Sequence, residues 1–271
     1  MSMPQVRKET SRNIQWVRSP KPNPRAALRL FCFPFAGGSD LTFRTWPMAL
    51  PADVEVCGIQ LPGHGNRLRE ALIDRIEPLV DALTPMLIPY MDRPFAFFGH
   101  SMGALIAFEV ARRLRCDGGP EPECLFVSGR PAPQIPDQER RTYDLPEPEF
   151  LAELRRLNGT PKEVLAHPEL LQLTLPIIRS DFALCQNYRY APDAPLDYPI
   201  FACGGVDDQE VSAEQLRAWG EQTTASFSAR LFPGDHFFLM SAKAALLKTL
   251  SGELEQIIMR QNATPSTSVT H

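Results

Sequence analysis

Long hydrophobic runs are missing from this chain of 271 residues. No apolar stretch approaches the roughly 20 residues that cross a bilayer, and the polar residues 1–25 lack the apolar core of a secretory signal. An excess of positive charge is missing too, because the net charge is −4, so a basic face for nucleic acid is not expected. We therefore expect a cytoplasmic protein with neither a membrane nor a nucleic-acid partner.

Cysteine patterns typical of metal or redox sites are also missing. The six cysteines include no C-x-x-C pair, and no Cys/His cluster has the spacing of metal ligands. Cys32, Cys57 and Cys203 lie in apolar runs, where a free cysteine behaves as a small hydrophobic residue. We expect reduced thiols, no metal and no cofactor.

The residues that are present indicate an α/β fold. Hydrophobic residues make up 44% of the chain, which is enough for a full core. Continuous apolar segments alternate with helical segments, a pattern typical of a mostly parallel sheet with helices on both faces. The predicted strands are 28–35, 54–61, 95–98, 123–127, 199–203 and 226–232, and the main predicted helices are 76–90, 104–115 and 242–260.

One segment, residues 134–197, interrupts this alternation. It holds helical patterns and no convincing strand, and it is too long for a simple crossover between neighbouring strands. The helical patterns cover 144–157, 168–174 and 175–188, with an N-cap and a first-turn proline at Thr160 and Pro161. We interpret the segment as a helical lid insertion; a small structural subdomain is the alternative.

The domain organisation follows from these assignments. Residues 26–133 and 198–261 are predicted to form the core, and residues 134–197 the lid. Residues 1–25 are expected to be a flexible leader, and the polar residues 262–271 a disordered tail.

The pentapeptide Gly99–Gly103 (GHSMG) is the most informative motif. It follows a short apolar strand and precedes an apolar helix, which is the setting of a nucleophile elbow. The small flanking residues fit a strained turn with closely passing backbone. We expect Ser101 to be a nucleophile. The N-terminus of the helix that follows it would then face the negative charge that develops during the reaction.

A serine nucleophile needs a base, and only five histidines are available. In this fold the acid and then the histidine follow the serine in the chain. His236 fits, because it lies in a loop between the last predicted strand and the last helix. Two aspartates compete as the acid: the G-x-x-D-x-x-V frame that begins at Gly205 selects Asp208, which we prefer, whereas a frame from Gly204 selects Asp207.

An oxyanion hole requires two backbone N–H groups. One is expected from Met102, the residue after the nucleophile, and the other from Ala36 in the glycine-containing loop after the first strand. No G-K-[ST] follows Gly37 and Gly38, so a phosphate-binding loop is not indicated.

Together these motifs resemble the type II thioesterases of polyketide and nonribosomal peptide synthesis, and the family is similar to the medium-chain acyl-carrier-protein thioesterases. The matching stretches are Cys32–Gly38, Gln60–Gly65 with Arg67, Phe97–Gly103, Gly159–Pro161, Leu175–Phe182, Gly204–Val211 and Pro233–Phe238.

The resemblance implies an α/β-hydrolase fold with a helical lid. It implies hydrolysis of acyl groups from the phosphopantetheine thiol of acyl or peptidyl carrier proteins, and it supports Asp208 as the acid. One position departs from the family: Phe35 stands where relatives often have His or Tyr, so that side chain cannot donate a hydrogen bond.

Two alternatives remain beside this interpretation, and a monomer is expected in each. An ester hydrolase or acyl-CoA thioesterase would share the fold and the triad and need no protein partner. A non-catalytic module that binds carrier proteins would be marked by a broken triad, whereas Ser101, Asp208 and His236 are all present.

Overall fold

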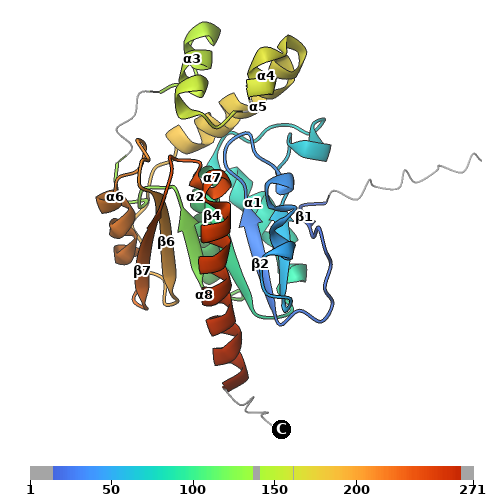
Figure 1. Cartoon of the computed structure of the whole chain (residues 1–271), viewed down its shortest axis with the longest axis vertical. Helices are drawn as coiled ribbons and strands as arrows, with labels where there is room; N and C mark the ends of the chain where they lie inside the picture. The colour runs from blue at the N-terminus through green and yellow to red at the C-terminus, as the bar shows by residue number, and fades with distance from the viewer. Residues whose placement is uncertain (1–14, 137–140, 161, 264–271) are drawn as a thin grey trace, which may run out of the picture.

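The computed structural model describes residues 15–136, 141–160 and 162–263. Most of the expected leader and tail, and Pro161 at the expected helix start, lie outside this described part. Figure 1 shows a twisted central sheet with helices in front of it and behind it, and a group of helices above one end of the strands.

The sheet has seven strands in the order β1-β3-β2-β4-β5-β6-β7. Every neighbouring pair is parallel except β1 with β3. The predicted α/β-hydrolase class is thereby confirmed. The strands are β1 (Val17–Arg18), β2 (Leu28–Phe33), β3 (Val54–Ile59), β4 (Phe95–His100), β5 (Leu125–Ser128), β6 (Ile200–Gly205) and β7 (Phe227–Phe232).

Helices bury both faces of this sheet, as the uninterrupted apolar strands require. Alternate residues of β2 point to opposite faces. Phe31 and Phe33 pack in the core with α1 (Ile76–Leu87) and α2 (Met102–Cys116), whereas Leu30 and Cys32 pack with α8 (Lys243–Ala263). The short helices α6 (Ala213–Arg217) and α7 (Phe238–Ser241) flank β7. Single 3₁₀ turns complete the loops at η1 (Asp40–Phe43), η2 (Trp46–Met48), η3 (Gly65–Arg67), η4 (Ile88–Tyr90) and η5 (Ala218–Gln222).

In its described residues, the segment between β5 and β6 has three helices and no strand of the sheet. It contains α3 (Glu147–Leu157), α4 (Lys162–Ala166) and α5 (Pro168–Gln186). These helices share a small core of their own, which includes Phe150, Leu154, Leu175 and Ile178. The two predicted pieces 168–174 and 175–188 are one helix, in which Pro176 is tolerated because the apolar face of α5 stays packed across it.

Most predicted boundaries shift by a few residues, and three of the differences matter most. The expected flexible leader is wrong for its last part, because Trp16 and Val17 are buried and Val17–Arg18 pairs with β3. A two-residue strand is too short to show a hydrophobic period, which is why the pattern missed it. β2 ends at Phe33 rather than at residue 35, since Pro34 has no N–H to donate to a sheet. α8 continues to Ala263, two residues into the expected tail.

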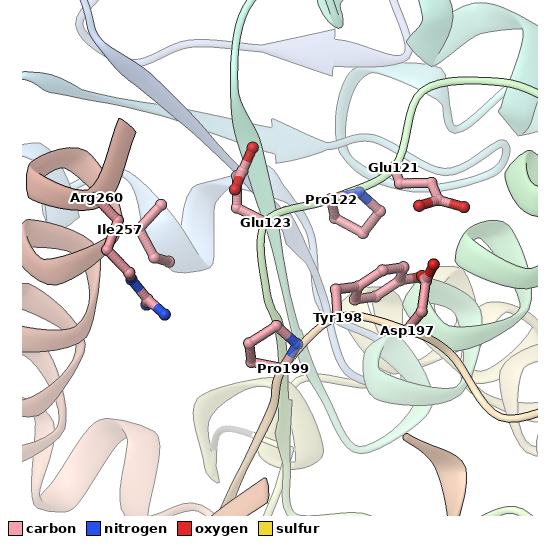
Figure 2. Close-up of a pocket in the computed structure, with 8 residues that line it drawn as sticks. All are labelled: Glu121, Pro122, Glu123, Asp197, Tyr198, Pro199, Ile257 and Arg260. Carbon is pink, nitrogen blue, oxygen red and sulfur yellow. The ribbon is translucent and has the colours of Figure 1, made fainter. Parts of the chain in front are cut away.

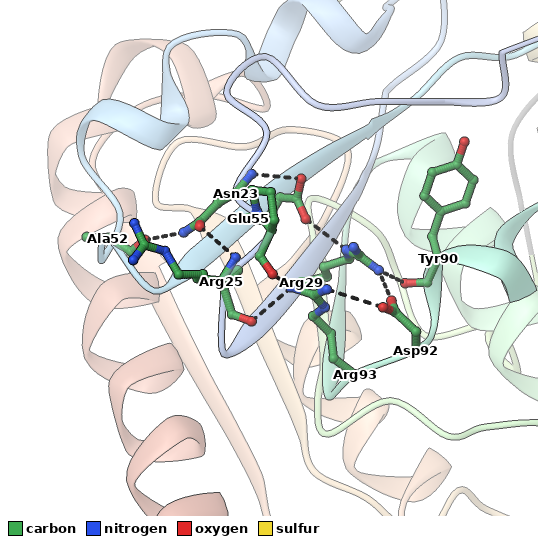
Figure 3. A network of polar contacts seen from close by, with 10 residues as sticks. Asn23, Arg25, Arg29, Ala52, Glu55, Tyr90, Asp92 and Arg93 are labelled. Atoms are coloured by element: carbon green, nitrogen blue, oxygen red, sulfur yellow. Dashed lines mark hydrogen bonds and ion pairs between the residues drawn. The ribbon is translucent and has the colours of Figure 1, made fainter.

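A polar network joins the amino ends of the central strands (Figure 3). Arg29 at the start of β2 donates through Nε to Glu55 Oε2 at 2.8 Å and through Nη1 to the carbonyl of Tyr90 at 2.6 Å. It also pairs with Asp92. Glu55 Oε1 accepts the backbone N–H of Asn23 at 3.1 Å. The side chains of Arg29 and Glu55 are only 12% and 9% exposed, so water does little to replace these bonds.

Replacing Glu55 with Gln is expected to lower the free energy of unfolding by about 1.5–3 kcal/mol, because a charge-assisted hydrogen bond is lost beside a nearly buried guanidinium. Urea unfolding measures the change. Arg113→Gln is the matched control. Arg113 pairs with Asp81 and Asp117 on the exposed surface, where water screens the charges. The unfolding midpoint of this variant should therefore equal that of the wild type. Equal losses in both variants would contradict a special role for the network.

Candidate active site

The predicted site residues lie at one edge of the sheet. Parallel strands place their carboxyl ends together, and each candidate follows such an end. Ser101 follows β4, Asp208 follows β6, His236 follows β7, and Ala36 follows β2. The helical segment α3–α5 lies at the same end of the molecule (Figure 1).

The turn at Ser101 has the strained geometry that an elbow requires. Ser101 has a φ of 53° and a ψ of −116°, a conformation that residues other than glycine rarely adopt. Gly99 and Gly103 make the turn possible. A Cβ on Gly99 would lie 2.2 Å from the Gly103 carbonyl oxygen, and a Cβ on Gly103 would lie 2.1 Å from the carbonyl oxygen of Phe33.

His236 and Asp208 are hydrogen-bonded. His236 Nδ1 lies 2.9 Å from Asp208 Oδ2, and the Asp208 side chain is fully buried. The other oxygen, Oδ1, accepts the backbone N–H groups of Glu210 and Val211 at 2.8 and 3.2 Å. The carboxylate is therefore fixed on both sides. It holds the proton on Nδ1 and leaves Nε2 of His236 as the basic nitrogen.

The same geometry distinguishes the two competing aspartates. Asp207 is exposed, and its backbone N–H donates to the carbonyl of Gly234 at 3.0 Å. The strand end and the histidine loop approach closely at Gly205, where a Cβ would lie 2.4 Å from the Asp235 carbonyl oxygen. The contact with His236 is thus made by Asp208, the residue that the frame from Gly205 selects.

Ser101 lies next to this pair, but the structure does not join them by a hydrogen bond. The ring of His100 is 5.2 Å from the ring of His236, centroid to centroid, and Ser101 is the next residue. No hydrogen bond of the Ser101 hydroxyl is found within the described residues. Catalytic hydrogen bonds are often long before substrate binds, so the arrangement remains compatible with proton transfer.

His100, the second residue of the elbow motif, is fully buried. Its Nδ1 lies 2.9 Å from the Ser128 hydroxyl, and its Nε2 has no hydrogen-bond partner. Burial first, and then the nearby His236, hold the pKa of His100 well below the ordinary histidine value. His100 is therefore neutral beside His236.

The two expected oxyanion donors have backbone N–H groups that are available to bind an oxyanion. Within the described chain, the backbone N–H groups of Ala36 and Met102 make no hydrogen bond, whereas Gly38 N–H donates to the Phe35 carbonyl at 2.8 Å. Phe35 itself packs edge-on against Phe237 at 5.1 Å between centroids, beside His236. The phenyl ring therefore serves packing at a position where a polar side chain would face the histidine loop.

Helices α3 and α5 touch this site directly. Gly159 rests on the ring of Phe237, since a Cβ there would lie 2.2 Å from Cζ. Arg156 Nη1 donates to Glu210 Oε1 at 2.6 Å, two residues beyond Asp208. On the other side, Ile178 of α5 lies against Gly37, next to Ala36.

Two residues near the site were missed as functional candidates. His64 and Asp181 are 4% and 2% exposed, and His64 Nε2 lies 2.9 Å from Asp181 Oδ2. The same oxygen accepts the N–H of Gly37 at 2.7 Å. Both residues lie in stretches matched to the family, Gln60–Gly65 and Leu175–Phe182. That was the available signal, but their separation of 117 residues hid the pairing.

Cavities elsewhere do not belong to this site. One of about 320 Å³ is lined by Glu121–Glu123, Asp197–Pro199, Ile257 and Arg260 (Figure 2). It lies where β5 and β6 begin, opposite the edge that carries Ser101.

The described residues contain neither a metal site nor a membrane-spanning helix. In ranges 15–136, 141–160 and 162–263 there is no group of three or more His, Cys, Asp or Glu residues that could hold a metal ion. Within those ranges, too, no helix is long and apolar enough to span a membrane. The six cysteines, all in the described part of the chain, form no disulfide.

The fold and this site define a class of enzyme. A parallel sheet with a serine elbow and a hydrogen-bonded histidine–aspartate pair at its carboxyl edge is the arrangement of a hydrolase. The model of the family "Thioesterase domain" matches residues 28–254. The chain belongs to this thioesterase family and is a hydrolase.

Two relatives align with this chain over nearly their whole length. The chain is 43% identical over 244 residues to the gramicidin S biosynthesis protein GrsT of Aneurinibacillus migulanus, covering 90% of this chain and 95% of that protein. It is 42% identical over 248 residues to the linear gramicidin dehydrogenase LgrE of Brevibacillus parabrevis, covering 90% and 94%.

Among solved structures, the type II thioesterase BorB from the borrelidin biosynthetic cluster superimposes with a TM-score of 0.80 at 38% identity. The match covers 90% of this chain and 97% of BorB. The fold is therefore that of a type II thioesterase.

Replacing Asp208 with Asn is expected to lower kcat by about 10³–10⁴-fold, because an amide no longer fixes the proton on Nδ1 of His236. Asp207→Asn is the control: the neighbouring exposed carboxylate is lost instead, and kcat should stay within about twofold. Steady-state hydrolysis of a p-nitrophenyl ester measures both. An equal loss in the two variants would remove the support for Asp208.

Proposed function

We propose that the protein is a serine thioesterase that hydrolyses acyl groups from the phosphopantetheine thiol of carrier proteins in polyketide or nonribosomal peptide biosynthesis. Its task would be to release stalled or incorrect acyl chains. The observation that carries the proposal is the 2.9 Å contact of His236 with a buried Asp208 beside a serine elbow. Relatives named for gramicidin S and borrelidin biosynthesis support the setting.

The proposed reaction starts with attack by Ser101. Its hydroxyl oxygen bonds to the thioester carbonyl carbon while its proton moves to His236 Nε2. The N–H groups of Ala36 and Met102 stabilise the resulting oxyanion, and Asp208 stabilises the imidazolium. The C–S bond then breaks, and the thiol leaves with the proton from His236.

Water completes the cycle. His236 removes a proton from a water molecule, which attacks the acyl ester on Ser101. The tetrahedral species collapses, the serine oxygen regains the proton, and the free acid leaves. The N-terminus of α2 faces the oxyanion and adds to its stabilisation.

Helices α3–α5 are proposed to be the lid of this site, residues 134–197 in the chain. Supporting contacts are those of Gly159 with Phe237 and of Ile178 with Gly37, which put the segment against both the histidine loop and the loop of Ala36. A lid in this place would shield the acyl-enzyme from bulk water and shape the acyl pocket.

The carrier protein is the partner in this proposal, and its phosphopantetheine arm is part of the substrate. The triad chemistry needs no metal and no cofactor of the enzyme's own, because the serine and the histidine supply the nucleophile and the proton transfers. A monomer carries every group that the proposed reaction uses.

Ser101→Ala tests the nucleophile and the substrate class. A carrier protein loaded with an acetyl group is incubated with the wild type or the variant, and its intact mass is followed. The wild type is expected to return the free thiol form and acetic acid, and the variant to be at least about 10³-fold slower, because no other residue replaces the attacking oxygen.

Comparison substrates separate the alternatives. Acetyl-CoA and p-nitrophenyl acetate are hydrolysed at lower kcat/KM than the acetylated carrier protein if the proposal holds. Hydrolysis of the simple esters with the carrier protein left acylated would contradict it. Release of an aldehyde or alcohol on addition of a nicotinamide cofactor would instead favour reduction, the activity that the name of LgrE indicates.

A further inference from the structure

Asp181 joins three segments that are far apart in the sequence. It lies on α5, and its Oδ2 accepts the N–H of Gly37 after β2 at 2.7 Å. The same oxygen contacts Nε2 of His64, after β3, at 2.9 Å. Asp181 and His64 are 2% and 4% exposed, so both lie in the protein interior. A buried carboxylate is stabilised only when it is paired and hydrogen-bonded.

An ionised Asp181 requires His64 to be an imidazolium. Its Nε2 faces the Asp181 carboxylate, and its Nδ1 faces the carbonyl oxygen of Pro62 at 2.9 Å. Both partners are acceptors, whereas a neutral imidazole has only one N–H. Only the doubly protonated ring donates both bonds, so Asp181 and His64 form a buried pair with no net charge.

The electrostatic surroundings agree with this protonation state. Burial lowers the pKa of His64, but the hydrogen bond and charge of Asp181, with the Pro62 carbonyl, outweigh burial and the positive Arg67, and the net pKa is raised above 6.5. Arg67 is the other charged group that faces His64, and its own charge is paired with Glu70. Directly after β3, the neutral Gln60 amide donates to the His64 carbonyl at 2.7 Å.

The Asp181–His64 pair binds the backbone N–H of Gly37, the residue after the expected oxyanion donor Ala36. Residues 35–38 form a turn closed by the bond from Gly38 N–H to the Phe35 carbonyl. Gly37, with a φ of 74°, is the third residue of this turn, as in a type II turn. Asp181 accepts the N–H of Gly37, and this bond anchors the turn that carries the Ala36 N–H.

A lone carboxylate at this place would oppose catalysis. It would repel the oxyanion that develops at the Ala36 N–H, because two negative charges in a water-poor site repel strongly. The positive charge of His64 cancels the charge of Asp181 while leaving its hydrogen bond to Gly37 intact.

We propose that His64 and Asp181 are positioning residues for acyl transfer: an imidazolium–carboxylate pair that fixes the oxyanion turn through Gly37 and keeps its surroundings electrically neutral. The proposal rests on the proposed function, since it takes Ala36 as an oxyanion donor. It also explains why α5 carries an aspartate that points into the core rather than toward water.

Single and double variants test the pair with p-nitrophenyl butyrate, which needs no carrier protein. His64→Gln leaves the Asp181 charge uncompensated. The expected result is a kcat at least about tenfold lower, approaching the 10²–10³-fold effect of losing an oxyanion donor, with KM within about twofold. Arg113→Gln, a substitution on the surface of α2 away from the site, should leave both constants unchanged.

The double variant His64→Gln/Asp181→Asn separates charge from packing. The new amide oxygen at position 181 still accepts the Gly37 N–H, and no charge remains, so kcat should recover at least about threefold over His64→Gln alone. A double variant as slow as the single one, or a single variant as fast as the wild type, overturns the proposal.

The pH dependence gives a second measurement. Because the folded-state pKa of His64 is raised, the imidazolium is present below that raised value and is lost as the pH rises through it. The kcat of the wild type should therefore fall as the pH rises through that value, and the double variant should lack this fall. Identical falls of kcat in both proteins would contradict the proposal.

A measurement on the wild type alone keeps the test independent of folding defects in the variants. Nitrogen-15 NMR of the histidine side chains should show both nitrogens of His64 protonated at pH 6, and a neutral His64 ring at that pH overturns the proposal. The proposed function fails separately: if Ser101→Ala still hydrolyses the ester, the nucleophile is wrong, whatever His64 does.

Discussion

The close approach of backbone at the serine turn is the constraint on which the rest of the site depends. Gly103 lies so near the carbonyl of Phe33 that a Cβ would be 2.1 Å from its oxygen. This contact brings the helix after Ser101 against the end of β2, from which the turn containing Ala36 starts. The proposed nucleophile and the proposed oxyanion donors therefore share one rigid junction, and the strain at Ser101 is balanced by the packed sheet and helix around it.

Charges near this junction are arranged in pairs or kept neutral. Asp208 faces His236, Asp181 faces His64, and burial keeps His100 uncharged. A site in which negative charge develops on an oxygen works best when the surrounding dipoles are fixed and no stray charge opposes them. The helical insertion takes part in this arrangement, because one of the paired carboxylates, Asp181, belongs to α5.

Much of the fold and of the site could be predicted from the chain alone, because both depend on local pattern. Apolar runs located six of the seven strands, and the G-x-S-x-G and G-x-x-D-x-x-V spacings pointed to Ser101 and Asp208. The failures have physical reasons. β1 is too short to show a period, and its stability comes from the burial of Trp16 and Val17 against the core. A proline inside α5 looked like a break, but packing on both sides of it maintains the helix.

By itself, the sequence determined the order of strands and helices, the identity of the turn residues and the small set of histidines that could act as a base. Tertiary structure alone decided which groups meet. It brought Asp208 rather than Asp207 to His236, and it joined His64 to Asp181 across 117 residues of chain. Hydrogen bonds form over about 3 Å in space, whereas sequence patterns record only neighbours along a strand, a helix or a turn.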